Sequence, residues 1–326
     1  MQVLQCSGKM ALFEQSCQPL LIIMEIIDIH THLGDILYPR EQSLIWETGV
    51  RKRPDWNDVY ERYNWPEWPK FHQIFGKATH RLNILAGQNR NRTATLENMQ
   101  ASMQKNGVSR SVVLSVYPHA PIEQIMQAAA KDKRIIPFTG PDYSSNAADH
   151  TARYRDEVAA GVRGLKLHPI IDKVRLDSPE TYAIVESFAP HQRPVLFHSG
   201  YAFYYLKKDE QANERPDFGE IDQVIPLIEA FPKVPFIAGH AGLGQVDEVI
   251  EKLAKYPNVS IDTSFQPPHV LQTLIQAFGP ERILYGSDSP WGGMEVAIRC
   301  VELACGNDEG VKRQIFNINA QALIGD

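Results

Sequence analysis

The sequence lacks the features that define several specialised classes of protein. It contains no run of about 18 apolar residues, the length that a transmembrane helix needs. Its four cysteines, at positions 6, 17, 300 and 305, form neither a CxxC nor a zinc-ribbon pattern. We therefore expect free thiols in a reducing, cytoplasmic environment. The net charge is only -6, with both signs mixed along the chain, which predicts neither a nucleic acid nor a membrane as partner.

What is present is typical of a globular protein with a large core. The chain has 326 residues, of which 43% are hydrophobic and 22% are charged. This length fits either two domains or a single α/β barrel. The apolar run at residues 20–24 is too short for a signal peptide and has no small-residue cleavage site. We interpret residues 1–23 as a disordered or non-native extension and expect the domain to span residues 24–326.

An aromatic stretch covers roughly residues 36–92. Four of the five tryptophans lie in it, and it shows no strand periodicity. A structureless loop of this length is uncommon in a compact domain, so we expect a helical, aromatic insertion. One alternative is that its aromatic side chains form a small core that holds the insertion together. The other is that they cover a substrate pocket, with Trp65 as the candidate pocket residue.

Short apolar strands alternate with amphipathic helices along the rest of the chain. This alternation predicts a parallel sheet covered by helices on both faces, and eight strands predict a (β/α)8 TIM barrel. The rival is an open doubly wound sheet, which would normally carry a glycine-rich G-x-G-x-x-G loop after its first strand, and that loop is absent. The predicted strands are residues 26–32, 111–116, 134–139, 162–168, 194–198, 235–240, 258–263 and 282–286.

Side chains that bind metals or transfer protons stand at the ends of five of these strands. Enzymes with this fold carry their chemistry at the carboxyl ends of the strands, so the five sets should meet. Imidazole and carboxylate groups gathered at one site are typical of a divalent metal centre. The candidates are His30 and His32 on the first strand, Lys166 and His168 on the fourth, His198 on the fifth, His240 on the sixth and Asp288 after the eighth.

The residue types suggest a role for each ligand. His30, His32 and His198 would supply nitrogen ligands, and Asp288 would supply an oxygen. Such a set suits Zn²⁺, with Mn²⁺ or Fe²⁺ as alternatives. Zn²⁺ lowers the pKa of a bound water to about 7, and Asp288 is placed to take the proton of that water. His240 either polarises a substrate carbonyl, shuttles a proton or supports the metal as an additional residue.

Other residues near the expected site have less specific predictions. Lys166 should face the barrel interior, where it either becomes carbamylated and bridges a second metal ion or binds a substrate carboxylate as an ammonium. His168 is expected to form a pocket wall or to support a ligand. Tyr201 and Trp291 are further candidates for lining the substrate pocket, although packing within their loops explains them equally well.

The ordered motifs resemble those of the amidohydrolase-related, metal-dependent hydrolases of the amidohydrolase superfamily. The resemblance implies a TIM barrel with one divalent metal at His30, His32, His198 and Asp288, and it implies a catalytic role for His240. The superfamily also includes decarboxylases and hydratases that use the same metal. Decarboxylase relatives often carry Glu where this chain has His30, which favours the hydrolase branch. The matching motifs are DIHTH at 28–32, GLKLHP at 164–169, FHSG at 197–200, GHAG at 239–242 and YGSDSP at 285–290.

The predicted function is therefore metal-dependent hydrolysis of an amide, ester or lactone bond in a small molecule by a metal-activated water. The alternative is a metal-dependent lyase, a decarboxylase or hydratase of an aromatic or unsaturated carboxylic acid. A third hypothesis is a metal-binding protein without turnover, which would give Asp288 and His240 little purpose. The expected partner is a small-molecule substrate, and the sequence leaves a homodimer open.

Overall fold

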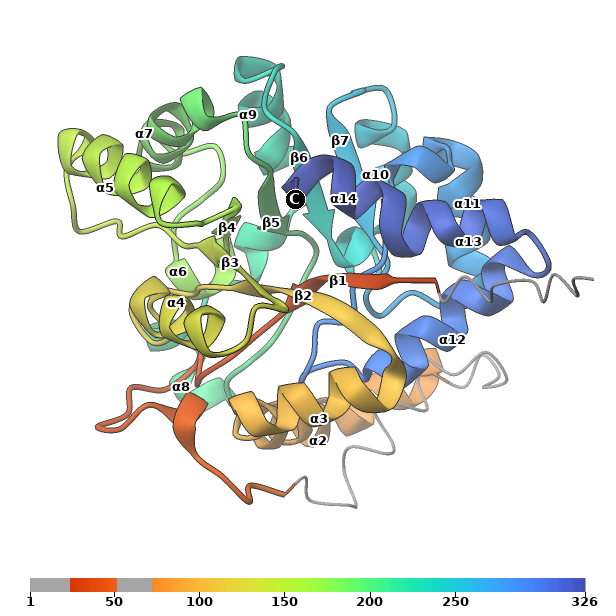
Figure 1. Cartoon of the computed structure of the whole chain (residues 1–326), viewed down its shortest axis with the longest axis horizontal. Coiled ribbons are helices and arrows are strands. Elements are labelled where there is room, and N and C mark those ends of the chain that lie inside the picture. Colours follow the sequence, from red (N-terminus) through yellow and green to blue (C-terminus); the bar gives the residue numbers. More distant parts are fainter. Residues whose placement is uncertain (1–23, 52–71, 326) are drawn as a thin grey trace, which may run out of the picture.

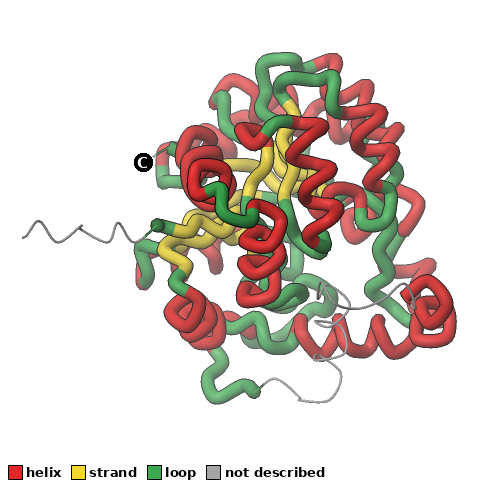
Figure 2. The backbone as a smooth tube through the Cα atoms, turned by 90° about the vertical axis from the view of Figure 1, so that its right-hand side faces the viewer, coloured by secondary structure: helices red, strands yellow, loops and turns green. Residues whose placement is uncertain are grey.

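The computed structural model describes residues 24–51 and 72–325. Eight parallel strands form one sheet in the order of the sequence, and helices surround them (Figures 1 and 2). The strands are β1 (Ile26–Thr31), β2 (Val108–Leu114), β3 (Ile135–Thr139), β4 (Gly164–Leu167), β5 (Val195–His198), β6 (Phe236–Gly239), β7 (Val259–Asp262) and β8 (Ile283–Leu284).

The first strand meets the segment that follows the last strand. The N–H of Asp288 donates to the carbonyl of His30 at 2.7 Å, and the N–H of His32 donates to the carbonyl of Ser289 at 2.7 Å. These bonds close the sheet, so the predicted (β/α)8 TIM barrel is confirmed. They also bring His32 and Asp288 next to each other, although the two residues lie at opposite ends of the sequence.

The helices form an outer layer and the connections to it (Figure 2). Several begin at residues that cap a helix well: Thr95 accepts a hydrogen bond from the N–H of Asn98, and Ser178 accepts one from the N–H of Thr181. The α-helices are α2 (His72–Asn91), α3 (Leu96–Asn106), α4 (Ile122–Lys131), α5 (Ala147–Ala159), α6 (Pro169–Asp172), α7 (Pro179–Phe188), α8 (Lys207–Asn213), α9 (Ile225–Ala230), α10 (Val246–Leu253), α11 (Pro268–Phe278), α12 (Met294–Cys305), α13 (Glu309–Arg313) and α14 (Asn319–Ile324).

Shorter helical turns join these elements. They are the 3-10 turns η1 (Leu44–Trp46), η2 (Ala189–His191), η3 (Pro216–Gly219), η4 (Ile221–Val224), η5 (His240–Gly242) and η6 (Pro280–Arg282), and the π turn η7 (Gln314–Ile318). The helical segment from Ile221 to Ala230 is divided into η4 and α9, because Pro226 has no N–H that could donate to a carbonyl of the preceding turn. The predicted strand at residues 282–286 is shorter, since the N–H of Gly286 donates to the Thr263 side chain instead.

Apolar side chains fill both the barrel and the layer outside it. Leu196, Ile237 and Leu284 pack together inside the barrel with Ile27 and Ile29 of β1. The sequence places Ile27 and Ile29 on the face opposite to His30 by strict alternation. The register between β1 and β2 shifts between Asp28 and Thr31, so that alternation is interrupted just before the metal-ligand candidates.

The aromatic stretch is described in part. Within it the structure contains η1 and α2, whereas Trp56, Trp65 and Trp68 lie outside the described residues. The insertion as a complete unit therefore stays a prediction, as does the boundary at residue 24. Cys300 and Cys305 are free thiols, as the sequence predicts. Among the described residues, no helix combines the length and the hydropathy that a membrane crossing requires.

Candidate active site

Three of the predicted ligands converge at the carboxyl end of the barrel. The Oδ1 atom of Asp288 lies 3.2 Å from Nε2 of His32 and 3.5 Å from Nε2 of His30. All three side chains are buried. Ligands bound at 2.0–2.1 Å to one tetrahedral ion lie about 3.3–3.4 Å from each other. The two measured separations fall on either side of this spacing, so these residues fit a divalent metal.

The buried polar atoms of this cluster also fit a metal. Oδ1 of Asp288 has no hydrogen bond of good geometry, although two imidazole nitrogens lie close to it. A buried carboxylate oxygen without a hydrogen bond costs free energy unless a cation satisfies it. His30, His32 and Asp288 form one of two groups of candidate metal ligands among the described residues. His30, His240 and Asp262 form the other.

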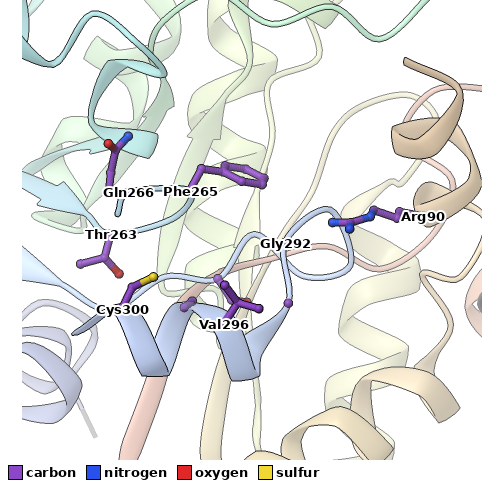
Figure 3. A pocket seen from close by; sticks show the side chains of 10 residues that line it. Arg90, Thr263, Phe265, Gln266, Gly292, Val296 and Cys300 are labelled. Carbon is purple, nitrogen blue, oxygen red and sulfur yellow. The ribbon is translucent and has the colours of Figure 1, made fainter. Parts of the chain in front are cut away.

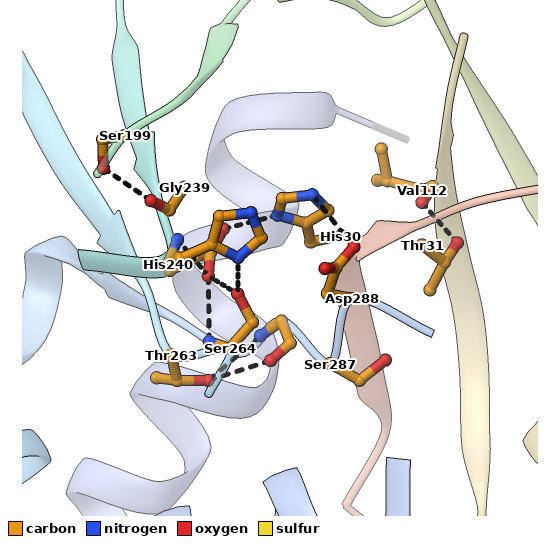
Figure 4. A network of polar contacts seen from close by, with 12 residues as sticks. His30, Thr31, Val112, Ser199, Gly239, His240, Thr263, Ser264, Ser287 and Asp288 are labelled. Carbon is orange, nitrogen blue, oxygen red and sulfur yellow. Dashed lines mark hydrogen bonds and ion pairs between the residues drawn. The ribbon is translucent and has the colours of Figure 1, made fainter. Parts of the chain in front are cut away.

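Asp262, at the end of β7, is a functional residue that the sequence interpretation missed. Its Oδ2 atom lies 2.7 Å from Nδ1 of His30, and the side chain is fully buried. This contact orients the His30 ring so that Nε2 faces Asp288 (Figure 4). The strand that ends in Ser-Ile-Asp carried a usable signal, because every other ligand candidate also stands at a strand end.

His240 follows β6 and contacts two other histidines of the site. Its ring centroid lies 4.6 Å from that of His30 and 4.8 Å from that of His198. Its Nδ1 atom lies 2.6 Å from Oγ of Ser264, and its N–H donates to Oδ1 of Asp262 at 3.0 Å (Figure 4). The predicted catalytic residue is therefore held from both its backbone and its side chain.

His198 lies beside the cluster and outside both groups of closely spaced ligand atoms. Its ring stacks on His168, with centroids 4.6 Å apart and an interplanar angle of 18°. Its Nε2 atom lies 3.2 Å from the carbonyl oxygen of Gly200, while Nδ1 is buried without a hydrogen-bond partner. The role of His198 as a ligand stays a prediction.

Lys166 and His168 differ in their surroundings. Nζ of Lys166 lies 3.4 Å from Nε2 of His30, inside the cluster. In contrast, both nitrogens of His168 have partners: the N–H of Ile171 at Nδ1, 3.4 Å away, and the Tyr204 hydroxyl at Nε2, 3.2 Å away. This arrangement suits the wall that the sequence predicts for His168. Tyr204, which the sequence interpretation did not select, therefore contacts a predicted site residue.

Burial determines the charges of the site. Desolvation lowers the pKa of His30, His168 and His240 well below the ordinary value, and it lowers the pKa of His198 to about 3. The imidazoles of these residues are therefore neutral at pH 7, the form that binds metals. Desolvation also lowers the pKa of Lys166 to about 8 and raises the pKa of Asp288.

Of the three predicted pocket residues, Trp65 lies outside the described residues. Tyr201 is 41% exposed, and its hydroxyl donates to Glu220 at 2.7 Å, on the surface. Trp291 is buried, and its ring meets that of Tyr204 edge to face with centroids 5.4 Å apart. Trp291 is thus linked to His168 through Tyr204, which contacts both residues.

A cavity lies between the ends of β7 and β8 and the helices α2 and α12 (Figure 3). Phe265 separates it from the site, since the Phe265 ring is 5.4 Å from the ring of His240. The other residues that line it are Arg90, Thr263, Gln266, Ser287, Gly292, Gly293, Val296, Ala297 and Cys300. None of the candidate metal ligands lines this cavity, and neither does Tyr201 nor Trp291.

Comparisons with solved structures support the fold. Chains of similar structure include a 5-carboxyvanillate decarboxylase from Novosphingobium aromaticivorans complexed with manganese (15% identity, 92% of this chain and 96% of that chain, TM-score 0.61). They also include a 2,6-dihydroxybenzoate decarboxylase from Rhizobium (14% identity, 93% and 99%, TM-score 0.61). A third is a probable 2-pyrone-4,6-dicarboxylic acid hydrolase from Acinetobacter baumannii (14% identity, 93% and 100%, TM-score 0.58).

The sequence itself identifies the family. No curated protein matches the chain. A family model described as Amidohydrolase matches residues 27–325, which include β1 with its two histidines and the loop that carries Asp288. The resemblance that the strand-end motifs indicate is thereby confirmed, and the protein belongs to the amidohydrolase family.

Proposed function

We propose that the protein is a metal-dependent hydrolase that cleaves a C–N or C–O bond, in an amide, ester or lactone, of a small molecule. The observation that carries the proposal is the buried Oδ1 of Asp288, which faces Nε2 of both His30 and His32 at 3.5 and 3.2 Å. This grouping supports a divalent ion and places one carboxylate where it can also accept a proton.

His30, His32 and Asp288 would hold the ion, with His198 as the fourth ligand. Zn²⁺ is the expected metal because imidazoles dominate the set, and Mn²⁺ and Fe²⁺ are the alternatives. When bound, such an ion polarises a substrate oxygen and makes a water molecule more acidic. A second ion is proposed only for the case in which Lys166 is carbamylated.

The residues of the chain supply the proton transfers. Asp288 would accept a proton from the attacking water. His240 stands against His30 and His198 and would relay the proton from Asp288 to the leaving group of the substrate. His168, Tyr204 and Trp291 form one wall of the substrate site. The proposal includes a cytoplasmic location and a small-molecule partner, and it leaves a homodimer open.

A lyase is the second candidate, and Lys166 is the observation that favours it. Lys166 is 1% exposed and makes no ion pair with a carboxylate of residues 24–51 or 72–325. A buried amine beside the ligands suits a substrate carboxylate, the group that a decarboxylase removes. Two of the structures compared above carry the names of decarboxylases of aromatic acids.

One experiment separates these functions. The full chain, loaded with Zn²⁺ or Mn²⁺, is incubated in H₂¹⁸O with a panel of esters, lactones, amides and aromatic carboxylic acids. A hydrolase introduces one ¹⁸O atom into the acid product. A decarboxylase releases CO₂ and leaves the remaining product without ¹⁸O, and a hydratase adds the elements of H₂¹⁸O to the acid without cleaving it. Either result would replace the first proposal by the second. Asp288→Asn is the control for metal-dependent turnover, and metal retention without any turnover would reject both.

A further inference from the structure

Asp262 connects a metal-ligand candidate to the catalytic candidate. Its Oδ2 atom lies 2.7 Å from Nδ1 of His30. Its Oδ1 atom accepts hydrogen bonds from the N–H of His240 at 3.0 Å and from the N–H of Ser264 at 2.9 Å. Both oxygens therefore act as acceptors, as expected of a carboxylate. A group that only accepts hydrogen bonds requires a proton on every partner atom that faces it.

The position of one proton follows from the Ser264 hydroxyl. Oγ of Ser264 donates to Oδ1 of Asp262 at 2.5 Å, so its single proton is committed to that bond. Nδ1 of His240 lies 2.6 Å from the same Oγ. Because the hydroxyl can only accept in this second bond, Nδ1 of His240 must donate and therefore carries the ring proton.

We infer that Asp262 sets the same tautomer in two histidines, directly in His30 and through Ser264 in His240. In both rings the proton is on Nδ1 and the lone pair is on Nε2. For His30 this directs the lone pair toward Asp288 and the expected metal. For His240 it makes Nε2 a proton acceptor, so the neutral ring cannot donate a hydrogen bond to a substrate carbonyl from that atom.

This inference adds detail to the proposed function. It rests on that function only where it assigns His240 the role of a base. Asp262 and Ser264 are positioning residues, since both act through His30 and His240. Of the roles that the sequence leaves open for His240, the geometry supports proton transfer and argues against carbonyl polarisation by the neutral ring.

Two glycines, Gly239 at the end of β6 and Gly286 after β8, leave the space that the His30–Asp262 pair occupies. A Cβ at Gly239 would lie 3.3 Å from Cε1 of His30 and 3.5 Å from Oδ2 of Asp262. A Cβ at Gly286 would lie 3.1 Å from Cβ of His30 and 3.3 Å from Cβ of Asp262. The pair is therefore packed closely on both sides, which limits rotation of the His30 ring away from the carboxylate.

The test measures the tautomers directly in the metal-free full chain. Histidine ¹⁵N–¹H correlation spectra distinguish a protonated ring nitrogen from an unprotonated one, and His30→Gln and His240→Gln identify the two sets of signals. We expect Nδ1 protonated and Nε2 unprotonated in both residues. The exposed His269 provides the reference for a ring in exchange between tautomers.

Substitutions at Ser264 and Asp262 separate the direct effect of Asp262 on His30 from its effect on His240 through Ser264. Ser264→Ala should shift the His240 signals toward those of an exchanging ring and leave the His30 signals in place, and Ser264→Thr should restore the His240 signals. Asp262→Asn should alter both residues and lower Zn²⁺ affinity about 10- to 100-fold in a chelator titration, whereas Ser264→Ala should change that affinity less than about twofold.

The inference is overturned by a wild-type protein that carries the His240 proton on Nε2, or by Ser264→Ala spectra identical to those of the wild type. If Asp262→Asn fails to fold, the comparison of Ser264→Ala with Ser264→Thr decides the result. None of these measurements uses a substrate. If the protein proved not to be a hydrolase, the tautomer result would still be interpretable. If the tautomers differed from those inferred, the hydrolase activity could still be tested with the substrate panel.

Discussion

At the scale of single residues, Asp288 combines a ligand role with an unusual backbone conformation. Its φ angle is +57°, in the left-handed region that Asn and Asp tolerate better than other residues with a Cβ. The conformation follows from the short loop after β8, in which the N–H of Asp288 donates to the carbonyl of His30. The residue type at this position thus meets both a chemical and a conformational requirement.

Two substitutions at Asp288 should separate its role as a ligand from the demands of its backbone conformation. Asp288→Asn and Asp288→Ala both remove the anionic ligand, so both should lower Zn²⁺ affinity by more than about 100-fold, beyond the loss typical of supporting residues. Only Asp288→Ala should also destabilise the metal-free protein, by about 1 kcal/mol, because Ala is strained at this φ. Metal titration and urea unfolding in the presence of a chelator measure the two effects. Unchanged Zn²⁺ affinity in Asp288→Asn would remove Asp288 from the ligand set.

Glu214 is a buried carboxylate that organises the loop after β5. Its oxygens accept hydrogen bonds from the N–H of Tyr204 at 2.7 Å and from that of Tyr205 at 3.2 Å. Burial raises the pKa of Glu214 to about 7, from a usual value of 4.5. In the native state the side chain therefore holds its proton at a pH where the unfolded chain has lost it.

This difference predicts how stability depends on pH. The contribution of Glu214 is complete below pH 4.5 and is lost as the pH rises through about 7, since raising the pH favours the unfolded state that binds fewer protons. Glu214→Gln removes this titration. Relative to the wild type, the variant should gain on the order of 1–3 kcal/mol of unfolding free energy between pH 5 and pH 8. Urea unfolding at the two pH values measures the difference, and a constant offset would contradict it.

At the scale of elements, the last turns of α2 attach the aromatic stretch to the mouth of the barrel. The side chain of Gln88 donates to the carbonyl of Tyr204 at 2.9 Å, and Arg90 donates to the carbonyl of Trp291. The side chain of Asn91 donates to Asp35, which follows β1. This helix therefore contacts the loops after β1, β5 and β8, and two of these loops carry residues next to the candidate ligands.

Gly87 makes the closest of these approaches possible. A Cβ at Gly87 would lie 2.8 Å from Cζ3 of the Trp291 ring. Replacing Gly by Ala inside a helix normally stabilises it by about 1 kcal/mol, yet Gly87→Ala should destabilise the protein by about 1–3 kcal/mol through this overlap. Adding Trp291→Leu should relieve part of the loss, as a double-mutant cycle measures.

A second helical glycine provides the matched control. A Cβ at Gly310 in α13 would meet only a side-chain oxygen of Asp308, at 3.2 Å. Gly310→Ala should therefore leave the unfolding free energy unchanged or raise it by up to about 1 kcal/mol. If Gly87→Ala stabilised the protein as much as Gly310→Ala does, α2 would not be packed against Trp291.

At the scale of the whole molecule, the candidate metal site lies where the barrel closes. His30 and His32 belong to the first strand, and Asp288 follows the last one, so a bound ion would join the two ends of the sheet. An ion that binds the folded chain only stabilises it by about 2.7 kcal/mol at a concentration 100 times the dissociation constant. Metal binding and barrel closure should therefore be coupled.

This coupling predicts a metal-dependent melting temperature. Zn²⁺ or Mn²⁺ should raise the melting temperature of the wild type above its value in chelator by several degrees, and it should have no such effect on His30→Ala. His269→Ala, which removes an exposed imidazole, should respond like the wild type. Thermal unfolding monitored by fluorescence across a metal series provides the measurement. An equal increase in His30→Ala would place the binding site elsewhere.

The sequence by itself determined the architecture and most of the site. A short apolar strand and the polar residue that ends it are local features. Because all eight strands are parallel and follow one another in the sheet, residues at their carboxyl ends must meet wherever the sequence places them. His30, His32, Lys166, His240 and Asp288 lie together at this end of the barrel, and their roles stay predictions.

Only the tertiary structure decided which atoms face each other. Asp262 contacts His30 across 232 positions of sequence. Its place at a strand end makes it a candidate for the site, but no local pattern indicates that it faces His30. The shift of register in β1, the choice of Tyr204 over Tyr201 beside His168, and the attachment of α2 to Trp291 depend likewise on packing between distant segments. Such contacts are selected by the fit of whole elements, so they become definite only when the barrel has formed.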